Sequence, residues 1–340
     1  MSKSIISVKN LTKKFGDLAA VDNISFEVQK GEIFGFLGPN GAGKSTTLRM
    51  LTTLTAPTSG SFTINGLNPK KDVDQLKKMV GLVAEKLIMY DYLSARENLL
   101  FFGKLYKVPQ DILEERTDKL LKMIGMWEWR DHKIGTYSTG MKQRINVIRA
   151  LVTDPDIIFM DEPTLGLDPQ STRQVREFIL ELNKKGKTII LTTHIMQEAE
   201  RLSDRVGIID HGKIIALDTP ENLKNSLADK RGTGVEFKVS EVPACMLDKL
   251  AKLPKVSVKQ LGDNRISISY GNGTEVNKLI DAIQDCNVGI LRMHTSEPTL
   301  EDVFIDLTGR EFRDKATEKE QKMPAAGPGH GFRKISSRIR

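Results

Sequence analysis

The sequence predicts an α/β domain followed by a smaller α+β domain. Its 340 residues exceed the usual size of one domain, about 100 to 200 residues, so two domains are expected. Short apolar runs at 156–160, 188–191 and 206–209 are separated by helical stretches, which is typical of buried parallel strands. A polar stretch at 228–234 ends this pattern, and a new order of strands and helices follows it.

The first domain comprises residues 1–227 and begins with a β-rich segment that contains one helix. This segment ends near the turn Asn65-Gly66. From 94 to 126, apolar residues recur at helical spacing, and we expect a helical insert at about 94–150. Strands of the β-rich segment are expected at 7–9, 24–28, 33–37 and 60–64.

The second domain, residues 234–310, predicts an α+β sandwich because strands and helices of similar length follow one another. Cys245 and Cys286 are the two cysteines of the sequence. Two cysteines are too few for a disulfide framework or a four-thiolate zinc site, and we expect both to be small core residues. Expected elements are a strand at 235–239, a helix at 244–253, strands at 256–261 and 265–270, a helix at 275–285, a strand at 288–293 and a short helix from Thr299.

Residues 311–340 lack any period and are expected to be a disordered, basic tail. The tail holds eight basic and four acidic side chains, which leaves the rest of the chain at only +3. A nearly neutral body argues against a nucleic-acid groove, so no nucleic acid is expected as a partner. Residues 332–340 carry four positive charges and an apolar face, so weak contact with anionic lipid is one interpretation, and a solvated tail is the other.

Composition places the bulk of the chain among ordinary globular proteins, with 39% hydrophobic and 28% charged residues. No window holds the 18 or so uncharged apolar residues that a spanning helix needs. The N-terminus runs into a strand-like pattern without a cleavable signal region. We therefore expect a cytoplasmic location.

A glycine-rich turn lies between the strand at 33–37 and a helix-forming run, and it fits the pattern Gly, four residues, Gly-Lys-Ser. Backbone N–H groups of such a turn surround phosphates, and the helix N-terminus adds its positive end. Lys44 would reach the outer phosphates, and the Ser45 hydroxyl would bind Mg²⁺. The predicted nucleotide contacts are Gly38, Asn40, Gly41, Gly43, Lys44, Ser45 and Thr46.

Two carboxylates follow the apolar strand at 157–160. Asp161, at the strand end, is the candidate to hold the metal of a phosphate-binding loop. Glu162 would extend toward the terminal phosphate and polarise an attacking water as general base. Taken alone, such a pair is more often a helix or loop cap, but beside a phosphate loop the catalytic interpretation is favoured.

Four further motifs accompany this site in the right order. Residues 137–144 resemble a signature sequence, with Ser138 and Gly140 retained, and 166–168 resemble a D-loop that includes Asp168. His194 resembles a switch histidine and Phe15 an adenine-stacking aromatic. Over residues 5 to about 225 the chain thus resembles the ATP-binding subunits of ABC transporters. The resemblance implies a P-loop NTPase cassette, with a mixed sheet, an antiparallel β subdomain and a helical insert.

Several of these residues have a second interpretation. Phe15 and His194 are alternatively core residues, and Ser138 is alternatively only the cap of a helix, a role compatible with phosphate contact. Glu85 stands where the family usually has a glutamine that links the Mg²⁺ site to the membrane-docking segment. It is predicted to be both a catalytic and a metal-site residue, or otherwise a solvated loop carboxylate.

The signature departs from the family's common form at Tyr137, Thr139 and Met141, a variant that resembles ATPases of drug, antibiotic or polysaccharide exporters. Residues 296–304 resemble the end of a C-terminal extension of daunorubicin-resistance-type ATPases, for which we expect dimer contacts or regulation.

The resemblance implies an ATPase that binds ATP and Mg²⁺ and works as a head-to-tail homodimer. It would energise a separate membrane permease, docked at about 85–100, from the cytoplasmic face of the membrane. Drug-like compounds, lipids and polysaccharides are the expected exported substrates. A soluble ABC-type ATPase in translation or DNA repair is one alternative. An ATP-binding protein with a regulatory or resistance role, not coupled to transport, is another.

Overall fold

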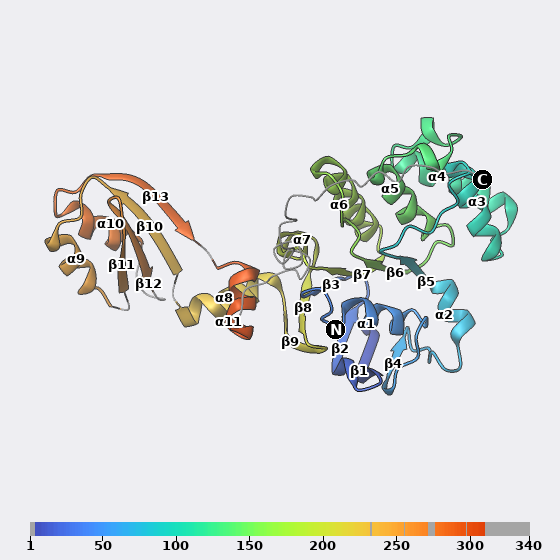
Figure 1. Cartoon of the computed structure of the whole chain (residues 1–340), viewed down its shortest axis with the longest axis horizontal. Helices are drawn as coiled ribbons and strands as arrows, with labels where there is room; N and C mark the ends of the chain where they lie inside the picture. Colours follow the sequence, from blue (N-terminus) through green and yellow to red (C-terminus); the bar gives the residue numbers. More distant parts are fainter. Residues whose placement is uncertain (1–3, 232, 255, 271–275, 297, 310–340) are drawn as a thin grey trace, which may run out of the picture.

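A computed structural model describes residues 4–231, 233–254, 256–270, 276–296 and 298–309. The tail at 311–340, and with it the expected lipid contact, lies outside these residues. Among the described residues, no helix is both long and apolar enough to cross a membrane. Figure 1 shows two bodies, a large one at the N-terminal side and a small sheet with two helices, joined through α8 (Pro220–Arg231) and α11 (Leu300–Thr308).

The large body is built on a six-stranded sheet of order β5-β6-β7-β3-β8-β9. All neighbouring pairs are parallel except β8 and β9, which form a hairpin. The mixed sheet expected from the sequence is confirmed. Its strands are β3 (Ile33–Leu37), β5 (Val80–Val83), β6 (Ile157–Asp161), β7 (Thr188–Thr193), β8 (Arg205–Asp210) and β9 (Lys213–Asp218).

An antiparallel sheet of order β2-β1-β4 covers one face of this sheet together with α1 (Lys44–Leu51). Its strands are β1 (Ser4–Phe15), β2 (Leu18–Gln29) and β4 (Ser59–Ile64). Between the two sheets, Phe26, Phe34 and Phe36 pack with ring centroids 5.1 to 5.4 Å apart. Aromatic contacts at this separation add to the stabilisation from burial alone.

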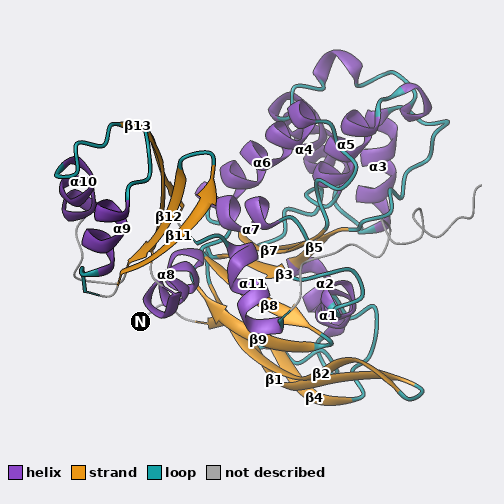
Figure 2. Ribbon diagram, turned by 60° about the vertical axis from the view of Figure 1, so that its left-hand side comes forward, coloured by secondary structure: helices purple, strands orange, loops and turns teal. Residues whose placement is uncertain are grey.

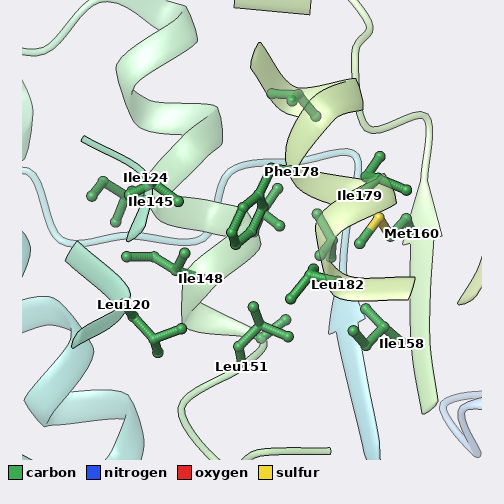
Figure 3. Packing of buried hydrophobic residues seen from close by; sticks show 14 of the residues in the cluster. Leu120, Ile124, Ile145, Ile148, Leu151, Ile158, Met160, Phe178, Ile179 and Leu182 are labelled. Atoms are coloured by element: carbon green, nitrogen blue, oxygen red, sulfur yellow. The ribbon is translucent and has the colours of Figure 1, made fainter. Parts of the chain in front are cut away.

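The opposite face of the sheet packs against helices of the insert and against α6 (Figure 3). Because side chains alternate along a strand, Ile158 and Met160 of β6 join this cluster, whereas Ile157 and Phe159 join the cluster on the other face. The helices of the large body are α2 (Val73–Met79), α3 (Ala95–Leu105), α4 (Gln110–Met123), α5 (Thr139–Arg149), α6 (Pro169–Lys184) and α7 (Met196–Leu202), with short 3₁₀ turns at Trp127–Trp129 and Ile134–Thr136.

The helical insert begins at a capping box on α3. The Ser94 hydroxyl accepts a hydrogen bond from the Glu97 backbone N–H, and the Glu97 carboxylate accepts one from the Ser94 N–H. Gly103 then lets α3 and α4 approach closely, since a Cβ there would lie 2.1 Å from a Leu113 methyl carbon. These contacts fix the direction in which the insert leaves the sheet.

The small body is an antiparallel sheet of order β11-β12-β10-β13 with two helices packed on one face. Phe237 and Ile266 face these helices and are fully buried. Its elements are β10 (Thr233–Val239), α9 (Ala244–Ala251), β11 (Val256–Gly262), β12 (Arg265–Tyr270), α10 (Val276–Gln284) and β13 (Ile290–Ser296).

The last helix, α11, differs from the sequence-based expectation, which grouped it with the small domain. Its buried side chains Leu300, Val303 and Phe304 pack with Leu223 and Leu227 of α8 and with residues of β3, α7 and β8. Figure 2 shows α8 and α11 side by side against the large body. The apolar spacing i, i+3, i+4 predicted a buried face but not the surface that buries it.

We predict that Phe304→Ala loosens this attachment. The side chain is 1% exposed, and removing such an aromatic costs about 3 to 5 kcal/mol in a well-packed site. The free energy of unfolding in urea, followed by circular dichroism, measures the loss. Leu307→Ala on the same helix is the control, because Leu307 is 41% exposed and its truncation is expected to cost only about 0.5 kcal/mol. Equal losses in the two variants would contradict the packing described for α11.

Candidate active site

Three neighbouring strands of the large sheet end at one edge. In the order β6-β7-β3, residue Asp161 pairs in register with Thr192, and Leu37 pairs with Thr193. Because the strands are parallel, the segments that leave their carboxyl ends meet at this edge. The glycine-rich turn follows β3, Glu162 follows β6 and His194 follows β7, so segments far apart in the chain form one site.

The glycine-rich turn needs glycine at particular positions. Gly41 and Gly43 have φ angles of 83° and 108°, in the region that side chains disfavour. At Gly38 a Cβ would lie 2.2 Å from the Ile209 carbonyl oxygen, because the turn passes directly over β8. Lys44 then starts α1, with Gly43 as its cap, so the turn lies at the N-terminus of a helix. Such a turn presents backbone N–H groups and a partial positive charge to an anion.

Lys44, Glu162 and His194 form a chain of polar contacts. The Lys44 ammonium lies 3.1 Å from Glu162 Oε1 and donates a hydrogen bond to the Gly38 carbonyl at 2.6 Å. The other Glu162 oxygen, Oε2, lies 2.9 Å from His194 Nδ1. Both Lys44 and Glu162 are buried, with 4% and 6% exposure. A charged pair this well buried persists only when both charges have partners, as they do here.

The environment of Glu162 sets its protonation state. Burial raises the pKa of this carboxyl, but the hydrogen bond with His194 and the charges of Lys44 and His194 outweigh burial. The pKa of Glu162 therefore lies below its ordinary value. The side chain is thus a carboxylate near neutral pH, held by partners on both oxygens.

Backbone geometry aims the Glu162 side chain. Its φ of 48° lies in the left-handed region, which is unusual for a residue other than glycine. The Glu162 N–H donates to the carbonyl oxygen of Thr192 at 3.2 Å and to its hydroxyl at 3.1 Å. These bonds to β7 hold a conformation that costs on the order of 1 kcal/mol or more. The strained turn points the carboxylate toward Lys44 and His194.

A second group of oxygens gathers around Asp161. Its Oδ1 accepts hydrogen bonds from the Ser45 hydroxyl at 2.8 Å and the Thr192 hydroxyl at 2.6 Å. Carboxylate and hydroxyl oxygens are the donors that Mg²⁺ prefers in phosphate-binding sites. The chemistry of this donor set therefore fits the metal expected from the sequence.

The signature residues belong to a different cluster. Ser138 caps α5 and accepts a hydrogen bond from the Met141 N–H at 3.2 Å. Gly140 is buried, and a Cβ there would lie 2.1 Å from the Ser171 hydroxyl. That hydroxyl donates to Asp168, which caps α6, and these hydrogen bonds lower the pKa of Asp168. The structure thus groups Ser138, Gly140 and Asp168 at two adjoining helix N-termini.

Two of the predicted site residues, Phe15 and Glu85, lie at the margin of the candidate active site. Phe15 ends β1 and is 54% exposed, so the alternative of a core residue is wrong, and the Lys13 ammonium lies 5.0 Å from its ring centroid. Glu85 follows β5 and is exposed. The residue before it is tied to α5, because the Asn146 amide donates to the Ala84 carbonyl at 3.1 Å. Asn40 lies within the phosphate-binding turn and is exposed, whereas Thr46 lies in the first turn of α1 and is partly buried.

Sequence reasoning missed Glu198 of α7, which is fully buried. Its carboxylate accepts hydrogen bonds from Thr164 at 2.6 Å and Thr193 at 2.7 Å, and Arg176 lies 3.3 Å away. It therefore joins the segment after Glu162 to the segment before His194. The residue type gave no signal of this role in the sequence, since glutamate on a helix is ordinarily exposed.

Family models match both parts of the chain. Residues 21–165 match the model of the ABC transporter domain. Residues 219–308 match the model "ATP-binding protein DrrA1-3-like, C-terminal domain", which begins near α8 and ends with α11. Along the sequence, α8 precedes the small body and α11 follows it. The matched range therefore includes both helices, which pack against each other.

Two relatives align with this chain over almost its full length. The linearmycin resistance ATP-binding protein LnrL of Bacillus subtilis is 38% identical over 91% of this chain and 100% of its own length. The Nod factor export ATP-binding protein I of Cupriavidus metallidurans is 38% identical over 92% of this chain and 99% of its own. A dimeric ATP-binding cassette bound to ADP and Pi has a TM-score of 0.57 and 28% identity, and covers 63% of this chain and 98% of its own.

The relatives are ATP-binding proteins, and the cassette of this chain is similar to theirs over almost its full length. ATP is the nucleotide, and the chain hydrolyses it. With a cassette and a DrrA-like C-terminal domain in one polypeptide, the chain belongs to the ATP-binding proteins of ABC transporters.

Proposed function

We propose that this chain is the ATPase of an exporter and that it hydrolyses ATP at the interface of a head-to-tail homodimer. The observation that carries the catalytic part is the contact chain Lys44–Glu162–His194. It supplies a cation for phosphate, an ionised base and a polar side chain that orients the base. The two named relatives, for linearmycin resistance and Nod factor export, support the direction of transport.

Lys44 exchanges partners when nucleotide binds. Its ammonium is held by the Gly38 carbonyl and by Glu162, and phosphate oxygens would replace Glu162. Glu162, freed on that side but still bonded to His194, would accept a proton from the attacking water. His194 keeps the carboxylate in position and stabilises the charge near the terminal phosphate.

Ser45 and Asp161 would hold Mg²⁺, and Glu85 is the third candidate, at the end of the neighbouring strand. When bound, the ion would supply positive charge that offsets the negative charge of the phosphates. The hydroxyl of Thr192 positions the Asp161 carboxylate from the other side. This arrangement leaves Glu162 out of the metal site and available as base.

Ser138, Gly140 and Asp168 are proposed to complete the site of a second copy. The hydrogen bonds of Ser138 and Asp168 lie within their own helix N-termini, apart from the Lys44 contacts. Helix N-termini bind phosphate well. A dimer that brings α5 of one copy to Lys44 of the other would therefore use both clusters. Phe15, exposed at a strand end, would stack on the adenine.

The proposed permease-docking surface lies at 85–100 and would face the cytoplasmic side of the membrane. Apolar side chains are exposed there, including Ile88 at 55%, Tyr90 at 48% and Tyr92 at 86%. Exposed apolar side chains gathered in one segment indicate a protein contact. Asn146 of the signature helix donates to the carbonyl of Ala84, the residue just before this segment, so the docking surface is connected to that helix.

We predict that Glu162→Gln lowers ATP hydrolysis by about 100-fold or more, because the amide holds position but accepts no proton. ATP affinity is expected to stay within a few-fold of the parent, and a dimer should accumulate with ATP and Mg²⁺. Phosphate release and size-exclusion chromatography measure the two effects. Lys44→Ala is the matched control: it should lose ATP affinity and form no such dimer. Hydrolysis at the parent rate by Glu162→Gln would exclude Glu162 as the base.

The lowered pKa of Glu162 predicts how stability depends on pH. A carboxyl whose pKa is lower in the folded state stabilises the fold above its ordinary pKa, about 4.5, and this contribution fades as the pH falls through the folded value. The parent should therefore be more stable than Glu162→Gln at pH 7, and the difference should shrink below about pH 4.5. Urea unfolding of both proteins across this range tests the prediction, and a gap independent of pH would refute it.

Glu85→Gln is expected to weaken the Mg²⁺ dependence of ATP binding, because it removes a charge that Mg²⁺ would compensate. ATP affinity titrated against Mg²⁺ in the parent and variant measures this. Lys86→Ala, a change at the next exposed position, is the control and should leave the curve in place. Superimposable curves for the parent and Glu85→Gln would remove Glu85 from the metal site.

A further inference from the structure

The two cysteines of the chain lie in the small body, remote in sequence from each other. Cys245 is in the first turn of α9 and is exposed, so the expectation that it is a core residue is wrong. Cys286 follows the end of α10 and is half-buried at the edge of the hydrophobic core of the small body. Cys245 lies on the outward face of α9, whereas its neighbour Met246 faces the core and is fully buried.

The two sulfurs meet where the start of α9 packs against the end of α10. The two thiols lie close enough to interact, and this interaction raises the pKa of the Cys286 thiol. One turn along α9, the Lys249 ammonium lies 3.3 Å from both the carbonyl oxygen and a carboxylate oxygen of Asp285, the residue before Cys286. Two contacts on successive turns of α9 therefore place Cys245 beside Cys286.

Backbone bonds hold the same segments together on the other side. The Ser240 N–H donates to the Gly289 carbonyl at 2.8 Å, and the Gly289 N–H donates to the Ser240 hydroxyl at 3.0 Å. Beneath the pair, Met246 of α9 and Ile283 of α10 are fully buried in one cluster. The cysteines are thus fixed between two anchored segments and do not depend on a loop to bring them together.

The two thiols differ in chemistry. The interaction with Cys245 raises the pKa of the Cys286 thiol, and burial raises it further, so Cys286 keeps its proton. Cys245 is exposed, so a peroxide in solution can reach its sulfur. An accessible sulfur next to a protonated partner is the arrangement of a reactive cysteine with its resolving cysteine.

We propose that Cys245 and Cys286 form a reversible intramolecular disulfide when the protein meets a hydroperoxide. The Cys245 thiolate attacks the terminal peroxide oxygen, the O–O bond breaks, and Cys245 becomes a sulfenic acid while hydroxide, or alkoxide from an organic hydroperoxide, leaves and takes up a proton. Cys286 then attacks the Cys245 sulfur, the S–O bond breaks, and the Cys286 proton leaves with the oxygen as water. In sum, two thiols and one hydroperoxide give one disulfide, one water and one water or alcohol. Two electrons pass from the sulfurs to the peroxide.

The bond would join the beginning of α9 to the end of α10 and close a loop of about 40 residues around the core of the small body. Closing such a loop restricts the unfolded chain, so oxidation is expected to raise the unfolding temperature of the small body by several degrees. A thiol reductant reverses the change by exchange. The ATP site lies in the large body, so serine variants at these positions should hydrolyse ATP at the parent rate.

The experiment treats the full chain with a small excess of hydrogen peroxide. Free thiols are counted and the intact mass is measured before and after treatment, and again after dithiothreitol. Two thiols per chain should disappear, with a mass loss of two hydrogen atoms and no dimer on a non-reducing gel. Dithiothreitol should restore both thiols. The unfolding temperature should rise with oxidation and fall on reduction.

The serine variants separate the two roles. Cys286→Ser should retain a Cys245 sulfenic acid, trapped by dimedone, whereas Cys245→Ser should react at least about tenfold more slowly. Parent-rate ATP hydrolysis shows that the large body of both variants is folded, and urea unfolding followed by circular dichroism checks the small body. Two thiols surviving in the parent would overturn the proposal. So would oxygen-mass adducts in place of the two-hydrogen loss, or disulfides between chains.

Discussion

The parallel register of β6, β7 and β3 is the constraint on which the active site depends. It brings the ends of the three strands to one edge, with Asp161 opposite Thr192 and Leu37 opposite Thr193. The phosphate-binding turn, Glu162 and His194 each occupy the first positions after a strand, and Asp161 is the last residue of β6. A slip of register by one residue would turn every strand side chain to the other face and separate these groups. Successive side chains of β6 are buried in two hydrophobic clusters, one on each face of the sheet. This burial prevents such a slip.

Burying charge at this edge is costly, and the structure compensates by sharing partners. Lys44 is held by the Gly38 carbonyl as well as by Glu162, and Glu162 is held in turn by His194. Glu198, fully buried one layer away, has two hydroxyl donors and Arg176 as partners. A buried charge with several partners is stable, but the fold loses much of its stability when one partner is removed and the charge is left uncompensated. The same network is therefore rigid, and it would rearrange if phosphate replaced Glu162 as the partner of Lys44.

Local patterns in the sequence were sufficient to predict most of this site, because the glycine-rich turn, the Asp161-Glu162 pair and His194 each follow an apolar run that reads as a strand. The mixed sheet was expected from the family resemblance and is confirmed. Glu198, the partner of α11 and the contact between Cys245 and Cys286 were not predictable. Each depends on which segments meet in space, and neither spacing nor composition encodes a contact between distant segments.

The attachment of the C-terminal body follows from the same packing. Val303 and Phe304 of α11 share a hydrophobic cluster with Ala199 of α7 and with Leu37, the last residue of β3. Helix α7 carries Glu198, whose carboxylate holds the Thr193 hydroxyl beside His194, and Leu37 precedes the phosphate-binding turn. The chain that leaves the large body through α8 therefore returns to it behind the active site. The small body is consequently joined to the large body through two helices that pack behind β3 and α7, the strand and helix next to the candidate active site, and not on a distant surface of the cassette.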